Sequence, residues 1–407
     1  MTQPDLNTYA LLQDYLLQSQ SEEETGCPLG LDLIEAAENR DIDRAKALIE
    51  QGADVNAQNG RGDGPPLKYA AQHNDGAMAR LLLNRGATLE WAAGLDGGGY
   101  GDISFLKAVD CGQPDSEVAR ILTNSEALFD VIDKDDIERF RALIVEGACV
   151  NARLHPDTPP LTHRVRSGAM VEVLHEAGAD WSAAVTVANG GVVEERSAVG
   201  SAVRPEGAWR KDGPGIVRAL AKIGLDMNRR GEGGETPLSI ALGGEAMGDD
   251  DLECGEVGDG GADLATVRAL IDCGADVNQV GVVGCAPLAA AAALQTKECC
   301  RLLLDAGAEV NAQDDSGATA LMFAAERQDI HLVRLLMAAG ADATLKTADG
   351  WSASAIAEEW RGPGKPNVVE QVIAERQRAH LLRAAKGQEA AAVVAHEPQK
   401  RDRRARL

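Results

Sequence analysis

Apolar and small residues recur along this chain in pairs of short helical stripes. In the clearest pair, Leu321, Ala324 and Ala325 share one helical face at spacings of i, i+3 and i+4. Leu332–Leu336 then supplies the apolar face of a second helix. Gly340 follows where a left-handed helix cap favours glycine. The pattern predicts a helix, a turn, a second helix and then an extended turn into the next pair.

The glycine that closes each pair returns at a fixed step. The interval from Gly274 to Gly307 equals the interval from Gly307 to Gly340. A constant period in this range is typical of stacked-repeat proteins. Neither helix of a pair can bury its apolar face alone, so the copies are expected to stack on one another.

Threonine precedes the first helix of two pairs. Thr319 is expected to cap its helix through the side-chain hydroxyl. Thr236 suits the same role, and Pro237 suits the first helical position because no amide partner is lost there.

These phrases resemble the ankyrin repeat. Gly234–Leu238 (GETPL) matches its opening, and Gly274–Asn278 (GADVN) matches its close. The resemblance covers residues 31–385 and implies an all-α ankyrin-repeat solenoid of about nine helix-turn-helix repeats with projecting β-hairpin fingers. Further closing phrases begin at Gly52, Gly86, Gly147, Gly178 and Gly224.

The chain departs from the family at the histidine that opens the first helix. This departure is expected to loosen the links between repeats without changing the fold. The residues found at that position are Lys68, Thr162, Ser239, Ala289 and Met322.

The repeat pattern divides the chain into four parts. Between Gly86 and Gly147 it predicts two degenerate repeats, Ile103–Thr123 and Ala127–Gly147. The N-terminal helix is expected either to cap the array or to dock a partner. The four parts are an N-terminal helix and linker (1–30), an ankyrin array (31–350) with insertions at 91–102, 181–196 and 243–263, a C-terminal capping repeat (351–385) and a flexible basic tail (386–407).

The composition excludes some classes of binding partner. The chain is 44% apolar but only 3% aromatic, and its formal net charge is −24. This charge argues against general binding of nucleic acid, which requires basic surfaces. It favours a cytoplasmic protein and is compatible with a basic partner. No segment approaches the ~18 apolar residues of a membrane span, so no membrane association is expected.

No pattern of catalytic or metal-binding residues is present, and the chain is therefore predicted not to be an enzyme and to need no cofactor or metal. The eight cysteines lack the spacing of a disulfide framework and are interpreted as reduced structural thiols. The acidic insertion at 243–263 lacks the glycine and glutamate positions of a calcium loop. A solvated loop and a docking segment for a basic partner remain alternatives.

Function is therefore expected to reside on the surface. The ankyrin resemblance implies that a partner protein binds the concave face through finger tips and first helices. The leading hypothesis is a monomeric interaction scaffold or adaptor; the alternative is an inhibitor or immunity-type protein that occludes a basic or enzymatic partner. Each candidate could also be an ordinary loop or stacking residue. The candidate partner-binding residues are Tyr69, Arg153, His155, Arg166, Arg230, Val280, Val282, Phe323 and Trp351.

Overall fold

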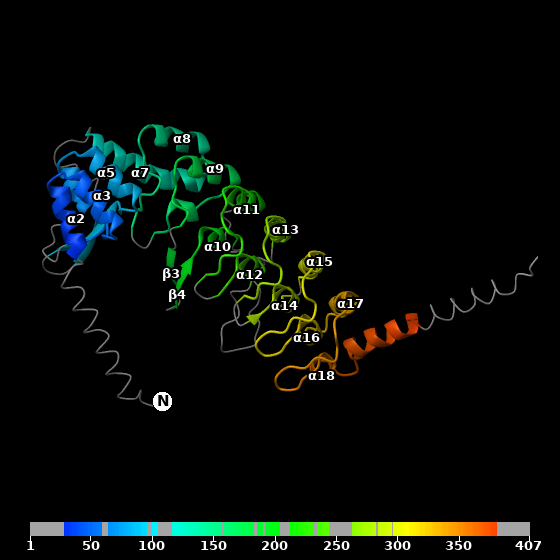
Figure 1. The fold of residues 1–407 in the computed structure, drawn as a ribbon. Helices are drawn as coiled ribbons and strands as arrows, with labels where there is room; N and C mark the ends of the chain where they lie inside the picture. The colour runs from blue at the N-terminus through cyan, green and yellow to red at the C-terminus, as the bar shows by residue number, and fades with distance from the viewer. Residues whose placement is uncertain are drawn as a thin grey trace, which may run out of the picture. The chain divides into compact units, whose positions relative to one another are not determined.

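The structure is a computed structural model. Short helices arranged in pairs make up most of it (Figure 1). It divides into two units, Met1–Gly233 and Gly234–Leu407. The residues described are 28–58, 64–95, 99–104, 116–155, 158–182, 185–189, 192–203, 212–231, 234–243, 263–281, 284–294 and 296–380. The expected N-terminal helix, the basic tail and nearly all of the acidic insertion lie outside these residues.

In the first unit, helices pair in sequence order and then stack on the next pair. Thus α2 packs against both α3 and α4, and α4 packs against α5. The elements are α2 (Pro28–Glu38), α3 (Ile42–Glu50), α4 (Pro66–Gln72), α5 (Gly76–Asn84), α7 (Glu117–Lys134), α8 (Ile137–Val145), the short 3-10 helix η1 (Leu161–His163), α9 (Gly168–Glu176), α10 (Ala198–Val203) and α11 (Gly213–Lys222).

In the second unit, the first helices form one row and the second helices another (Figure 1). All seven residues of α14 are buried, since its alanines let neighbouring helices approach closely. The elements are α12 (Pro237–Ala241), α13 (Leu264–Asp272), α14 (Pro287–Ala293), α15 (Lys297–Asp305), α16 (Ala320–Glu326), α17 (Ile330–Ala339), α18 (Ala353–Glu359) and a helix at 368–380.

The helix caps test the sequence predictions directly. Gly340 ends α17 with a φ of 101°, which confirms the expected left-handed cap. Thr236 and Ser239 form a reciprocal capping box at α12, again as expected for Thr236. The prediction for Thr319 is wrong, because its hydroxyl makes no capping bond. The Met322 amide donates instead to the Thr319 backbone carbonyl at 2.9 Å, and the residue three positions on carries no hydroxyl to complete a box.

Asparagine side chains link several of the described fingers to the next repeat. The Asn311 amide group donates to the carbonyl of Gly340 at 3.4 Å, and its oxygen accepts from the Asp342 amide at 2.8 Å. Each link therefore joins consecutive repeats without the histidine that the family carries. Equivalent pairs of bonds start from Asn56, Asn151 and Asn278.

Two β-hairpins project from the first unit. Strand β1 (Glu90–Leu95) pairs antiparallel with β2 (Gly99–Ser104), and Glu90 lies opposite Ser104. Strand β3 (Val185–Asn189) pairs antiparallel with β4 (Val192–Arg196), and Val185 lies opposite Arg196. The hairpins occupy the segments where the sequence pattern placed the first two insertions.

One continuous helix, α7, crosses the boundary between the two degenerate repeats expected at Ile103–Thr123 and Ala127–Gly147. Helix α7 runs without interruption from Glu117 to Lys134, and Ile103 belongs to strand β2 rather than to a helix. No glycine or proline interrupts residues 117–134, so nothing in that stretch stops the helix. The first part of α7 packs against α5, and the helix ends in a turn onto α8. One helix thus serves two consecutive repeats, and no finger separates them.

Side chains of α7 replace the contacts of the missing finger. The Asn124 amide group donates to the carbonyl of Glu146 at 3.2 Å. The buried Ser125 hydroxyl accepts from the amide of Cys149 at 2.9 Å and donates to the carbonyl of Ile121 at 2.6 Å. These bonds reach the turn after α8 just as the asparagine links reach the turns of the other repeats.

Candidate functional site

Three of the candidate residues lie on the fingers or first helices of the first unit. Tyr69 is half-buried on α4, and the Lys68 amine lies 6.0 Å from the centre of its ring. Arg153 and His155 are half-buried in the segment after α8. The backbone of Arg153 is bonded to residues 87–89, since its amide donates to the Ala87 carbonyl at 3.2 Å and its carbonyl accepts from the Leu89 amide at 2.7 Å.

Arg166 belongs to a partly buried cluster between η1 and α9. Its guanidinium lies 3.7 Å from a carboxylate oxygen of Asp133 on α7, and its side chain is only 18% exposed. Arg164 holds the same carboxylate through both Nε and a terminal nitrogen. The Arg164 guanidinium lies 5.6 Å from the centre of the Phe129 ring, which fixes its orientation.

The remaining candidates are distributed over separate loops and repeats. Arg230 is exposed in the turn after α11 of the first unit. In the second unit, Val280 is 36% exposed, Phe323 is half-buried on α16, and Trp351 is 46% exposed. Val282 lies outside the described residues. The candidates thus occupy two units rather than one constellation, and Arg153, His155 and Arg166 are the members closest together along the chain.

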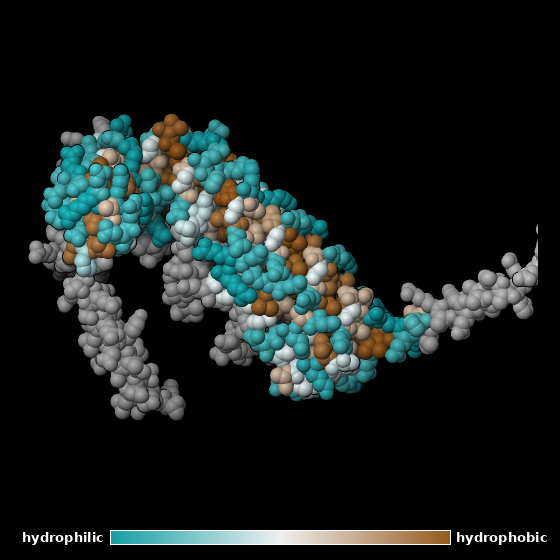
Figure 2. All heavy atoms as spheres, in the orientation of Figure 1, coloured by the Kyte–Doolittle hydropathy of each residue, from teal (hydrophilic) through white to brown (hydrophobic). Residues whose placement is uncertain are grey.

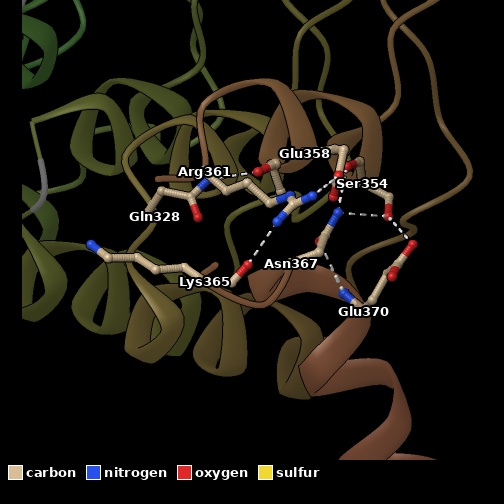
Figure 3. Close-up of polar contacts among 8 residues, drawn as sticks. Gln328, Ser354, Glu358, Arg361, Lys365, Asn367 and Glu370 are labelled. Atoms are coloured by element: carbon tan, nitrogen blue, oxygen red, sulfur yellow. Dashed lines mark hydrogen bonds and ion pairs between the residues drawn. The ribbon is translucent and has the colours of Figure 1, made fainter. Parts of the chain in front are cut away.

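Sequence reasoning missed a second exposed tryptophan in the last repeat. Trp360 follows α18 and is 62% exposed. The chain around it is fixed by polar contacts (Figure 3), since Arg361 pairs with Glu358 at 2.5 Å and donates to the Lys365 carbonyl at 3.0 Å. The signal was present in the sequence, because Trp360 stands between Glu359 and Arg361 in a polar stretch.

The same turn joins α18 to the final helix. The Asn367 side chain donates to the Ser354 carbonyl at 2.8 Å and accepts from the Glu370 amide at 3.2 Å (Figure 3). Asn367 therefore caps the helix at 368–380 while tying it to α18. These bonds hold α18 in place against the final helix, and Trp351 and Trp360 lie at the two ends of α18.

Exposed apolar side chains are otherwise scattered. Most of the face seen in Figure 2 is hydrophilic, and its apolar atoms form small separate patches. Val145 at the end of α8 is 88% exposed, and Leu31 on α2 is 42% exposed. Single exposed aliphatic residues are common on protein surfaces, so neither marks a site by itself.

The cysteines of the structure fit an interior role. Burial raises the pKa of Cys149 and Cys285 to about 11 and that of Cys300 to about 12. Thiols with such pKa values are protonated and poorly nucleophilic near neutral pH. Among the described residues, no group of His, Cys, Asp and Glu is placed to hold a metal ion. The helices of that part of the chain also include none with the length and apolarity needed to cross a membrane.

Comparison with known families places repeats in both units. A family model described as ankyrin repeats in many copies matches residues 33–83, which contain most of α2 and all of α3 and α4. A second model, described as ankyrin repeats in three copies, matches residues 258–347, from α13 to α17. No curated protein matches the chain. The paired helices, the glycine caps and the two family matches agree: the chain is an all-α ankyrin-repeat protein.

Proposed function

We propose that the chain is a scaffold or adaptor that binds a partner protein through its finger tips and first helices. Ankyrin repeats generally mediate protein–protein interaction and are typically not enzymes. Ion pairs join several of the second helices to the neighbouring repeat, such as Arg80 with Glu117 at 2.7 Å and Arg334 with Glu375 at 2.9 Å. Partner binding is therefore assigned to the opposite side of each repeat.

The observation that carries the proposal is the pair of exposed tryptophans at the ends of α18. Tryptophan is usually well buried, and it is strongly enriched among residues that dominate binding energy at interfaces. Trp351 and Trp360 are nevertheless 46% and 62% exposed in a chain that is only 3% aromatic. A partner that covers them would remove a large apolar area from water.

A capture experiment tests this proposal. The full chain and a Trp351→Ala, Trp360→Ala variant are used as baits in native cell extract, and stoichiometric partners are identified by mass spectrometry. Val145→Ala is the matched control, because it truncates an even more exposed apolar residue in the other unit. We expect a partner that the control retains and the double variant loses. Absence of any partner, or equal capture by all three baits, contradicts the proposal.

The inhibitor or immunity-type alternative is supported by one observation, the net charge of −24. An acidic inhibitor that attracts a basic enzyme should associate much faster at low than at high ionic strength. It should also abolish the activity of the captured partner. An association rate that is insensitive to salt, with partner activity preserved, favours the scaffold.

A further inference from the structure

Three consecutive fingers of the second unit are strongly acidic. They comprise residues 274–285, 307–318 and 340–351, and each begins at the left-handed glycine at the end of a second helix. Six acids and one base lie in these segments, which leaves an excess of five negative charges. The acids are Asp276, Glu309, Asp314, Asp315, Asp342 and Asp349, and the base is Lys346. We call these segments the acidic fingers.

Contacts between neighbouring fingers place the three side by side. The Asp315 carboxylate of the middle finger lies against Gly284 of the first finger and leaves no room there for a Cβ. On the other side, the Ala348 amide of the third finger donates to the Ser316 carbonyl of the middle finger at 2.8 Å. The three tips therefore belong to one surface, which crosses three repeats.

Exposed apolar side chains stand on the two outer fingers. Val280 of the first finger is 36% exposed, and Trp351 of the third is 46% exposed. Asp315 of the middle finger is exposed, as is Asp349, two residues before Trp351. Neither carboxylate forms an ion pair within the described part of the chain. The surface thus offers apolar area together with negative charge that the described residues do not neutralise.

Three other acids of the fingers also keep their charge. Asp276, Asp314 and Asp342 each accept a hydrogen bond from a backbone amide of their own finger, at 2.8–2.9 Å. A bond from an uncharged amide to a carboxylate favours the ionised form without neutralising it. The negative charge is therefore a fixed property of the folded fingers near neutral pH.

We infer that the acidic fingers dock a positively charged segment of a partner protein, one that places lysine or arginine side chains on Asp315 and Asp349 and covers Trp351. Opposite charges across an interface speed association and select the partner. The face of a tryptophan ring also attracts a cation more strongly than other aromatic rings do. A nucleic acid would be repelled by the same carboxylates. This inference rests on the proposed function and names the chemistry of the partner.

The test uses the full chain and a defined probe. A fluorescently labelled peptide that alternates lysine with serine around one central leucine is titrated, and its anisotropy is measured. The same peptide with glutamine or glutamate in place of lysine is titrated in parallel. The site variant is Asp315→Lys, Asp349→Lys. The matched control, Asp272→Lys, Asp305→Lys, makes the same charge change at exposed positions at the ends of α13 and α15.

We expect the lysine peptide to bind the control within about twofold of the wild-type chain, and to bind the site variant about tenfold more weakly or worse, a difference of roughly 1.4 kcal/mol. An Asp315→Asn, Asp349→Asn variant with an unchanged circular dichroism melting curve should also bind more weakly, which separates loss of the site from loss of the fold. Trp351→Ala should weaken binding as well, whereas Val145→Ala should not.

Four results overturn the inference. They are failure of the lysine peptide to bind, equal binding of the glutamine or glutamate peptide, equal weakening by the site variant and the control, and unchanged affinity of the Trp351→Ala variant. Equal weakening by the site variant and the control would assign the attraction to net charge alone.

The outcome is distinguishable from failure of the proposed function. A partner captured from extract equally by the wild-type chain and the Asp315→Lys, Asp349→Lys variant leaves the proposed function standing and rejects docking of a basic segment on the acidic fingers. Capture of no partner by the intact chain rejects the proposed function itself.

Discussion

At the scale of single residues, short polar side chains decide how repeats are joined. Asn56, Asn151, Asn278 and Asn311 each bond to both the carbonyl and an amide of the next turn. Asparagine is suited to this because its amide offers a donor and an acceptor on one rigid group. The helix-opening histidine of the family is thus not needed for continuity between these repeats.

The link made by Asn311 can be tested by a graded pair of substitutions. Asn311→Ala removes both bonds and should lower the free energy of unfolding by about 1–2 kcal/mol, since each bond contributes about 1 kcal/mol net. Asn311→Asp keeps the acceptor for the Asp342 amide and loses only the donor to Gly340, so its loss should be smaller. Urea unfolding measures both. Equal midpoints for wild type and the alanine variant would show that water replaces the link fully.

At the scale of elements, α7 shows that a helix can replace a finger. The N-caps of the second helices are regularly spaced in the second unit, where Asp263, Thr296 and Asp329 follow one another at the same step as the closing glycines. The step from Ser116 to Asp136 is much shorter. No room for a finger remains at that spacing, and the chain stays helical throughout. The turn after α8 then forms its hydrogen bonds with Asn124 and Ser125 of α7.

Ser125 is the residue on which this replacement depends most. Its hydroxyl is fully buried and satisfies the amide of Cys149. Ser125→Ala leaves that buried amide without its acceptor and should cost about 1–3 kcal/mol of stability. Asn124→Ala removes an exposed bond to Glu146 and should cost less, because water can take its place. Thermal unfolding of both variants checks the order, and a reversed order would contradict this account of α7.

At the scale of the whole molecule, we expect the repeats within each of the two units to stabilise one another. In a repeat array each repeat contacts only its neighbours, so a local defect spreads by loss of stacking. Gly307 lies after α15 with a φ of +91°, and the following amide, of Ala308, donates back to Leu303 at 2.9 Å. A Cβ at Gly307 would meet nothing within 4 Å, so the cost of substitution is backbone strain alone.

Gly307→Val should therefore weaken the second unit selectively. A β-branched residue at this φ costs roughly 1–2 kcal/mol or more. Hydrogen exchange should accelerate in α14 to α17 and stay unchanged in α2 to α5. Gly307→Asn is the control, since asparagine tolerates the left-handed region and should behave nearly like wild type. Acceleration in both units, or in neither, would show that the damage is not confined as stacking predicts.

The candidate binding residues show which features of a site can be predicted from the sequence. Alignment with the repeat pattern placed Trp351 and Val280 on exposed loops, where the structure also has them. It gave no weight to Trp360, because exposure of that ring depends on how Arg361 and Asn367 fold the following turn back onto α18. The repeat pattern also could not pair Arg166 with Asp133, because that carboxylate comes from α7, and both α8 and η1 intervene along the chain.

The sequence by itself determined the repeat type, the paired helices and the glycine caps. These features are local, since they depend on the helical period and on a left-handed conformation that glycine adopts without strain. The tertiary structure alone decided that α7 joins two repeats. It also decided that Arg153 bonds to the residues that lead into β1. Each of these depends on contacts between residues distant in sequence. A regular sequence period does not indicate where the stacking of the repeats becomes irregular.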